Sequence, residues 1–255
     1  MPDALFPGGL TQDTLLGGRV KIAQPKTGYR VAVDPVLLAA AIPAAPGDTV
    51  TDLGAGTGAV TLCLAARVPG CRISALELEA DLTELTNQNI AQNGWQARAE
   101  ALQGDVALPP FPPGSFDHVA MNPPYLAANR ATAPAEHLRR VAAVEGTAKL
   151  SNWIRSAWTL TRQGGTITLI HRADRLDEIL TNFSALQLGG YTTIPIWPKA
   201  GEPAGRVLVR CKKGDGSPFI LRPGLVLHEA SGAFTPQAEK ILRDGWGLDE
   251  ALASL

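Results

Sequence analysis

The chain has 255 residues, of which 45% are hydrophobic and 18% are charged, and its 26 glycines bring the apolar share above half. This composition can fill a complete hydrophobic core, which excludes general disorder. The formal net charge of −1 excludes a uniformly basic protein that coats nucleic acid. The length fits one large α/β domain or slightly more.

The N-terminus and the cysteines indicate a cytoplasmic protein. Residues 1–10 contain two prolines, one acid and no cationic stretch, so no signal peptide is expected. No apolar run reaches the roughly 18–20 residues of a membrane span. The three cysteines (Cys63, Cys71 and Cys211) have no paired spacing, which predicts neither a disulfide framework nor a zinc site. We therefore expect no membrane contact and no bound metal.

Along the chain, strand patterns alternate with helix patterns, which predicts an α/β protein with helices on both faces of a parallel sheet. The first elements should be a hairpin over 15–22 on a Gly-Gly turn and a helix opened by Asp34. Five strands are then expected at 49–53, 72–76, 98–102, 116–121 and 166–170. Three helices lie between these strands: the first ends near Arg67, the second spans 80–92 and the third spans 147–161. A long loop at 126–146 precedes the third helix.

The C-terminal third completes the predicted sheet. A helix over 174–186 leads to two strands at 192–196 and 206–211, whose short Pro/Gly connection suits an antiparallel pair. The tail should add a strand near 219–227 and a terminal helix. We expect three parts: an N-terminal extension at 1–46 that packs on the core, a main domain at 47–235 and a helical tail at 236–255.

The first informative motif is the glycine loop Asp52-Leu53-Gly54-Ala55-Gly56-Thr57-Gly58, directly after the strand at 49–53. Glycines let the backbone turn sharply and approach a ligand at the N-terminus of the next helix. Glu77 lies 19 residues after Gly58, where a carboxylate can accept both hydroxyls of an adenosine ribose. The loop also fits the dinucleotide fingerprint in its Gly/Ala form, and a tight turn without a ligand is the plain alternative.

Two acids favour S-adenosylmethionine over NAD. Asp52 stands where a carboxylate can meet the ligand's ammonium group, whereas it would repel the pyrophosphate of a dinucleotide. Asp105, in Gly104-Asp105-Val106 after the third strand, is placed to accept from an adenine amino group. An ordinary turn aspartate is the alternative for Asp105.

The second motif, Asn122-Pro123-Pro124-Tyr125, follows the strand at 116–121. The carboxyl end of a strand beside the first strand of an open α/β sheet faces the ligand crevice. Because the two prolines fix an extended backbone, the Asn122 side-chain oxygen and the Pro123 carbonyl can both accept from one planar –NH2 group. These bonds would aim the nitrogen lone pair at a methyl sulfonium, with Tyr125 as a stacking surface. A rigid strand-end turn is the alternative.

With these two motifs, the sequence resembles the class I S-adenosylmethionine-dependent methyltransferases, and within them the bacterial tRNA1(Val) (adenine-N6)-methyltransferase family. The resemblance spans residues 10–235 and rests on both motifs and on the stretches 15–19, 24–30, 34–39 and 142–153. It implies a Rossmann-like, seven-stranded sheet with an antiparallel last strand, S-adenosylmethionine without a metal, and methylation of an adenine beside a tRNA anticodon. The sequence departs from the family at Leu126, where an aromatic is common, and in its alanine-rich 126–146 loop.

The predicted site has two groups of residues. The reacting amino group would be held by Asn122, Pro123, Pro124 and Tyr125. The cofactor would be held by Asn122 together with Tyr29, Arg30, Asp52, Gly54, Ala55, Gly56, Thr57, Gly58, Glu77 and Asp105. Arg30 is expected to pair with the cofactor's carboxylate, the alternative being a solvated position on a hairpin edge.

Three segments are locally basic although the whole chain is not. Residues 14–33 carry a net charge of +4, 122–144 of +2 and 199–213 of +4. If they flank the crevice they form a rim for tRNA phosphates, and scattered solvated charges are the alternative.

Other functions share parts of this pattern. The same tetrapeptide chemistry serves a protein glutamine N5-methyltransferase or an rRNA guanine-N2 methyltransferase. The 47 residues before Asp48 are short for the helical domain that release-factor glutamine methyltransferases usually carry. From other classes, an NAD-binding oxidoreductase would need a second substrate domain, and a catalytically silent RNA-binding module would show no turnover.

Overall fold

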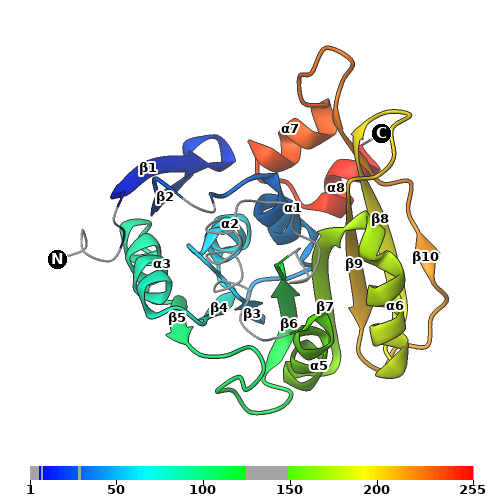
Figure 1. Cartoon of the computed structure of the whole chain (residues 1–255), viewed down its shortest axis with the longest axis horizontal. Coiled ribbons are helices and arrows are strands. Elements are labelled where there is room, and N and C mark those ends of the chain that lie inside the picture. Colours follow the sequence, from blue (N-terminus) through cyan, green and yellow to red (C-terminus); the bar gives the residue numbers. More distant parts are fainter. Residues whose placement is uncertain (1–5, 7, 28–29, 125–148, 255) are drawn as a thin grey trace, which may run out of the picture.

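The computed structural model describes residues 6, 8–27, 30–124 and 149–254. Its centre is one twisted sheet with helices on both faces (Figure 1). Seven of its strands lie in the order β5 (Ala99–Gln103), β4 (Arg72–Glu77), β3 (Thr49–Leu53), β6 (Phe116–Met121), β7 (Thr161–Arg172), β9 (Arg206–Lys212) and β8 (Gly189–Lys199). The pairs among β5, β4, β3, β6 and β7 are parallel, and β9 is antiparallel to both of its neighbours. The predicted Rossmann-like, mostly parallel sheet with an antiparallel strand is confirmed, and two further strands extend it beyond the seven expected.

The edge beyond β8 is longer than predicted. Two short strands, β10 (Ile220–Leu221) and β11 (Leu225–His228), each pair in parallel with β8. The single strand expected at 219–227 is therefore two strands. Pro223 and Gly224 interrupt the ladder between them, because proline offers no N–H and the glycine sits at φ +91°.

Helices cover the two faces of the sheet in two groups. One face packs against α1 (Val33–Ala41), α2 (Ala59–Arg67) and the C-terminal helices α7 (Pro236–Leu242) and α8 (Leu248–Ala253). The other face packs against α5 (Leu150–Leu160) and α6 (Leu176–Ala185), the latter preceded by a short 3-10 turn, η3 (Ala173–Arg175). Helix α3 (Ala80–Gln92) follows β4.

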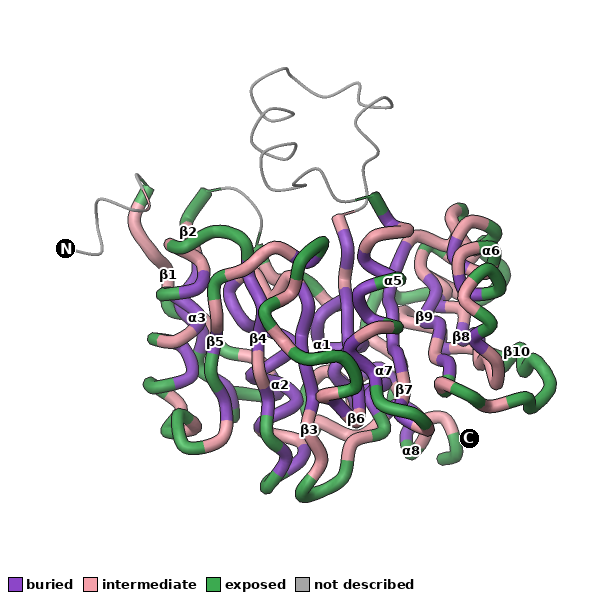
Figure 2. The backbone as a smooth tube through the Cα atoms, turned by 90° about the horizontal axis from the view of Figure 1, so that it is seen from below, coloured by how far each residue is buried: buried purple, intermediate pink, exposed green. Residues whose placement is uncertain are grey.

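The strands divide their side chains between two cores with a period of two residues. Val50 and Ala120 join the core beneath α1 and α2, whereas Leu53 and Met121 join the core beneath α5. Figure 2 shows that the buried residues run along the central strands and that the exposed ones gather in the connections. The strand ends are therefore fixed by packing on both faces, which gives the loops that follow them a rigid base.

The N-terminal hairpin forms a separate two-stranded sheet beside α3 (Figure 1). Strand β1 (Leu10–Leu15) pairs with β2 (Val20–Pro25), and the 3-10 turn η2 (Leu16–Gly18) joins them. The hairpin is longer than the predicted span of 15–22. Helix α1 begins at Val33 with Ala32 as its N-cap, two residues earlier than predicted, so Asp34 lies in the first turn instead of capping it.

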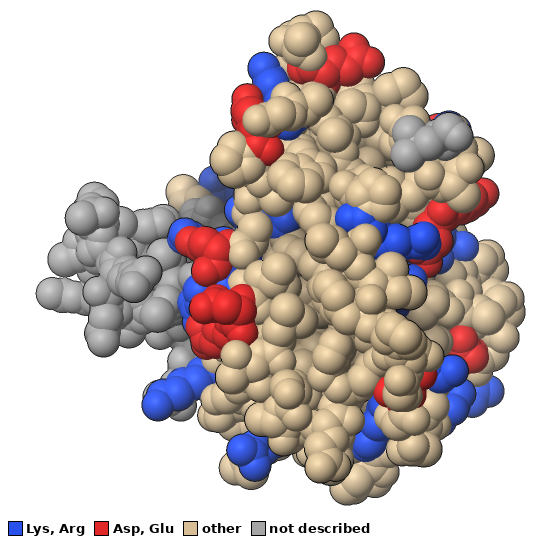
Figure 3. Space-filling view, turned by 90° about the vertical axis from the view of Figure 1, so that its right-hand side faces the viewer, with Lys and Arg blue, Asp and Glu red and all other residues tan. Residues whose placement is uncertain are grey.

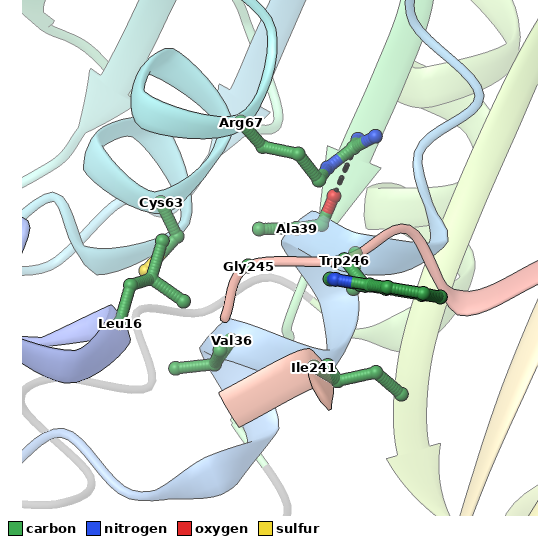
Figure 4. A pocket seen from close by; sticks show the side chains of 9 residues that line it. Leu16, Val36, Ala39, Cys63, Arg67, Ile241, Gly245 and Trp246 are labelled. Carbon is green, nitrogen blue, oxygen red and sulfur yellow. Dashed lines mark hydrogen bonds between the residues drawn. The ribbon is translucent and has the colours of Figure 1, made fainter. Parts of the chain in front are cut away.

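A small pocket separates α1 and α2 from the C-terminal tail (Figure 4). It is lined mainly by apolar side chains, and Arg67 Nη2 closes one side by donating to the carbonyls of Ala39 and Ile42 at the end of α1. None of the predicted cofactor residues lines this pocket. The tail thus packs into the same core as α1, while the division at 46 and 235 stays a prediction. Within the described residues, no helix is both long enough and apolar enough to cross a bilayer.

Candidate active site

The carboxyl ends of four neighbouring strands bring the two sequence motifs together. In the β3–β6 register Leu53 lies opposite Met121, so the glycine loop and Asn122 begin at adjacent positions on this edge. On the other side, Leu53 lies opposite Leu76, so Glu77 follows at the same level. Glu77 is in turn opposite Gln103, which places Asp105 just beyond it. The predicted residues form one row along the edge, in the order Asp105, Glu77, glycine loop, Asn122.

The glycine loop is held by its own backbone and by neighbouring side chains. The N–H groups of Gly54 and Ala55 both donate to the Leu76 carbonyl, at 2.8 and 3.0 Å. Gly54 has φ +70°, and a Cβ there would come within 2.3 Å of the Trp153 ring. Gly56 has φ +60°, but a Cβ on it would meet nothing within 4 Å. The loop is therefore closed against α5 at Gly54 and open at Gly56, which leaves room for a ligand on the Gly56 side.

Glu77 is fixed in place by backbone donors. One carboxylate oxygen accepts from Gly56 N–H at 2.7 Å and the other from Glu79 N–H at 3.0 Å. The residue is 7% exposed. Each oxygen keeps a further lone-pair position, so the carboxylate can still accept the two hydroxyls of a ribose. This geometry suits the role predicted for Glu77.

Asp52 lies behind the loop, where it is 2% exposed. Its carboxylate accepts from the N–H and the hydroxyl of Thr61 in α2, at 3.2 and 2.9 Å. Burial raises the pKa of Asp52 to about 7, the bonds from Thr61 oppose that rise, and the charge of Glu77 adds to it. The described partner of Asp52 is thus Thr61, and contact with a ligand ammonium stays a prediction. A positive ligand charge nearby would favour the ionised form of Asp52.

Asp105 and two apolar neighbours line the far end of the row. Asp105 Oδ1 accepts from Ala107 N–H at 2.8 Å, which orients the carboxylate in a turn. Leu78 and Leu108, which follow Glu77 and Asp105, are 38% and 83% exposed. If the cofactor's adenosine binds here, as predicted, these leucines offer apolar surface to its ring and Asp105 offers an acceptor to its amino group. The sequence analysis missed both leucines.

The Asn122-Pro123-Pro124 segment follows β6 directly, outside any helix or strand, with Pro123 buried and Asn122 partly exposed. Tyr125 lies outside the described residues, as does Tyr29. The structure therefore places three of the four residues predicted to hold the amino group, directly beside the glycine loop.

Arg30 is engaged by the N-terminal hairpin. Its guanidinium forms an ion pair with Asp13 at 3.0 Å and donates to the Thr11 hydroxyl and the Pro25 carbonyl. The predicted pairing of Arg30 with a cofactor carboxylate would have to replace or share the Asp13 contact. It stays a prediction.

Several cations of the predicted basic rim also have structural partners. Arg206 pairs with Asp34, Arg210 pairs with Asp249, and Lys213 donates to two backbone carbonyls. On the face shown in Figure 3, basic side chains lie among acidic ones and do not form one continuous basic patch. The segment 122–144 lies almost wholly outside the described residues. The rim is therefore less positive than the sequence sums suggest.

The residues present fit S-adenosylmethionine. Glu77 and Asp105 are the acceptors that an adenosine needs, and Asp52 with Glu77 supplies negative charge near the glycine loop for a cationic ligand. Three further side chains shape this site without having been predicted: Trp153 against Gly54, and Thr86 and Asn89 of α3, which donate to the carbonyls of Gly56 and Thr57. Within the described part of the chain, no group of three or more His, Cys, Asp or Glu side chains is arranged to hold a metal.

Comparisons with known proteins agree with this geometry. Residues 31–145 match the methyltransferase small domain. The tRNA1(Val) (adenine(37)-N6)-methyltransferase of Aeromonas salmonicida is 27% identical over 222 residues, which cover 84% of this chain and 89% of that one. The enzyme of the same name from Shewanella sp. (strain MR-4) is 29% identical over 228 residues, with 85% and 92% covered.

Solved structures give the same class. Protein Atu636 of Agrobacterium tumefaciens, described as a predicted O-methyltransferase, is 29% identical with a TM-score of 0.69, and the match covers 83% of this chain and 96% of that chain. A putative S-adenosylmethionine-dependent methyltransferase from Methanococcus maripaludis shares the fold, with a TM-score of 0.53 at 14% identity over 72% of this chain and 87% of that one.

The fold, the site and these similarities define a class I S-adenosylmethionine-dependent methyltransferase. S-adenosylmethionine is its cofactor. Within that class, the similarity to tRNA1(Val) (adenine-N6)-methyltransferases that the sequence predicted is confirmed over most of the chain.

Proposed function

We propose that this methyltransferase modifies the N6 amino group of an adenine in tRNA, the adenine at position 37, in the cytoplasm. The observation that carries the proposal is the position of the Asn122-Pro123-Pro124 turn, which leaves β6 opposite the start of the glycine loop. The name shared by the similar enzymes supports the choice of RNA and base.

The proposed chemistry depends on positioning. Bound S-adenosylmethionine supplies a methyl group made electrophilic by its sulfonium. The Asn122 side-chain oxygen and the Pro123 carbonyl accept the two amino hydrogens, which turns the nitrogen lone pair toward that methyl group. The N–C bond forms as the S–C bond breaks, and the amino proton then leaves to water. An amino group oriented in this way needs no general base before the attack. The turn suits this chemistry, because it offers hydrogen-bond acceptors to the amino group.

The same turn suits other planar –NH2 groups, so the substrate must be identified directly. We propose to incubate the protein with methyl-labelled S-adenosylmethionine and either tRNA lacking this modification or a release factor, and then to digest each and identify the labelled product. N6-methyladenosine in tRNA supports the proposal. Methylglutamine, N2-methylguanosine or a methyl group on oxygen would replace it.

A matched variant ties the product to the proposed site. Asn122→Asp keeps an acceptor of similar shape but introduces a charge, and Asn122→Ala removes the acceptor. Asn122→Ala should lose transfer by about 100-fold or more, since removing one oriented polar group often costs that much, whereas Asn122→Asp, which keeps an acceptor, should lose less. Full transfer by Asn122→Ala would exclude this role for Asn122.

A further inference from the structure

Helix α3 holds the N-terminal hairpin through asparagine side chains. Strand β2 pairs with β1 along one edge, and along its other edge it meets α3. Asn93 Oδ1 accepts from Lys21 N–H at 2.9 Å while its Nδ2 donates to Lys21 carbonyl at 2.7 Å. Asn89 makes the same pair of bonds with Ala23: its Oδ1 accepts from Ala23 N–H at 2.7 Å and its Nδ2 donates to the Ala23 carbonyl at 2.9 Å. The two amides, one helical turn apart, thus replace the neighbouring strand that this edge of β2 lacks.

Asn89 makes two contacts that Asn93 does not. Its Nδ2 also donates to the carbonyl of Thr57, inside the glycine loop, at 2.9 Å. Its Oδ1 accepts a second bond from Gln92 at 2.7 Å. All four hydrogen-bonding positions of this amide are therefore used, and the residue is 0% exposed. One buried side chain thus binds the hairpin and the cofactor loop at the same time.

The hairpin in turn leads into predicted cofactor residues. Tyr29 and Arg30 follow β2 in the chain after residues 26–28, and Arg30 forms an ion pair with Asp13 on β1. A buried amide whose hydrogen bonds are all formed tolerates little displacement. A shift of the hairpin therefore strains the Asn89 bond to Thr57, and a shift of the loop strains the Asn89 bonds to Ala23.

We propose that Asn89 is a positioning residue that couples the N-terminal hairpin to the cofactor-binding loop, so that cofactor binding stabilises the hairpin and the hairpin's attachment supports cofactor affinity. The coupling rests on the shared contacts of one side chain with Ala23 and Thr57. It concerns cofactor binding alone and is independent of which substrate is methylated.

Helix α3 offers three matched control variants. Asn87→Ala removes the same pair of bonds from a strand residue, Ala101 of β5, and touches neither the loop nor the hairpin. Asn93→Ala loosens the hairpin alone. Thr86→Val removes a bond to the loop carbonyl of Gly56 and keeps the methyl group that packs beneath Gly58. Asn89→Ala removes the contacts to both.

The first measurement is the dissociation constant of S-adenosylhomocysteine by titration calorimetry. Asn89→Ala should weaken binding about tenfold, as expected for the loss of a buried hydrogen bond that orients the loop. Asn87→Ala and Asn93→Ala should stay within about twofold of the wild type, well below that loss. Wild-type affinity in Asn89→Ala, or equal losses in all three asparagine variants, would overturn the proposal.

The second measurement separates coupling from general stability. Hydrogen exchange of the Lys21 and Ala23 amides is followed with and without saturating S-adenosylhomocysteine. In the wild type the ligand should slow exchange about fivefold or more, as for an ordinary coupling between two sites. The slowing should persist at both amides in Thr86→Val and at Ala23 in Asn93→Ala, and it should vanish in Asn89→Ala at Lys21, whose own acceptor Asn93 that variant keeps. If the wild-type hairpin exchanges equally with and without ligand, the proposal fails, and this outcome does not depend on any variant folding.

Discussion

Two aspartates on adjacent strands show how differently the two ends of the sheet are built. Asp117, near the amino end of β6, accepts from the N–H and hydroxyl of Thr49 and from Arg162. These donors outweigh burial and lower its pKa to about 2. Asp52, at the carboxyl end of β3, has Thr61 as its described donor, and burial together with the nearby charge of Glu77 raises its pKa to about 7.

The difference separates a structural end from a binding end. At the amino end His118 also contacts Asp48 and Thr166, at 3.0 and 2.8 Å, so the polar groups there satisfy one another. At the carboxyl end two neighbouring carboxylates, Asp52 and Glu77, have backbone and hydroxyl donors and no described cationic partner. Negative charge left uncompensated beside the glycine loop is suited to a cationic ligand.

The largest effect should follow from Asn122→Ala at the carboxyl end. Methyl transfer to tRNA is expected to fall about 100-fold or more, because one of the two acceptors for the amino group is lost. The melting temperature should change little, and the affinity for cofactor should fall far less than the rate, because the other predicted cofactor residues remain. Single-turnover rates and calorimetry check these points, and a weakened affinity with an unchanged rate would assign Asn122 to cofactor binding alone.

The next effect concerns cofactor affinity through Glu77. Glu77→Gln keeps the shape but removes the charge, and a hydrogen bond to a charged acceptor is worth about 1.5–3 kcal/mol. The dissociation constant of S-adenosylmethionine should therefore rise about 10- to 100-fold. Glu79→Gln is the matched control, because Glu79 lies two residues away and contacts Glu77 through its backbone N–H, which the substitution keeps. Equal losses in both variants would contradict the role of the Glu77 carboxylate.

At the amino end the expected effect is on stability. Asp117→Ala leaves Thr49 N–H without its acceptor and should lower the free energy of unfolding by about 1–3 kcal/mol, with wild-type cofactor affinity. In the wild type, the stabilisation from Asp117 should be present above about pH 4 and disappear as pH falls toward 2, because its pKa is lowered in the folded state. Chemical denaturation at several pH values measures both. Loss of cofactor binding in Asp117→Ala would contradict the assignment of a purely structural role to the amino end of the sheet.

The smallest effect is the pH dependence of cofactor binding through Asp52. Its pKa is raised in the folded state, so ionisation of Asp52 costs stability, and the free energy of unfolding should fall as pH rises from about 4 to 7. A cationic ligand favours the ionised form, so affinity for S-adenosylmethionine should weaken as pH falls from 8 to 6, by up to about tenfold over the whole range. Asp52→Asn, which can still accept from Thr61, should remove this dependence. A slope that persists in the variant would assign it to another group.

The sequence predicted the parts of the fold whose signals are local. Strands β3 and β6 match their predicted spans, because short apolar runs there end in glycine or proline. Strand β7 runs from Thr161 to Arg172, beyond the predicted 166–170, because pairing with β6 and β9 carries the ladder past Gly164 and Gly165. Strand β1 was missed because four of its six residues are polar.

The site divides in the same way. Motif residues such as Glu77 and Asn122 were predictable because their chemistry depends on their place after a strand. The role of Asn89 was not predictable, because a polar residue in a helix is normally assigned to the solvent-facing surface. Only the structure shows that β2 packs against it. The paired state of Arg30 and Arg206 was likewise invisible, because their partners are 17 and 172 residues away in the chain.

The most direct test of the account compares the two ends of the sheet in one experiment, the single-turnover rate of methyl transfer to unmodified tRNA at saturating cofactor. Asn122→Ala should lose about 100-fold or more, while Asp117→Ala, at a temperature where it is folded, should react at the wild-type rate. Equal rates for Asn122→Ala and the wild type, or an equal loss in both variants, would contradict the assignment of chemistry to the carboxyl edge of β3 and β6.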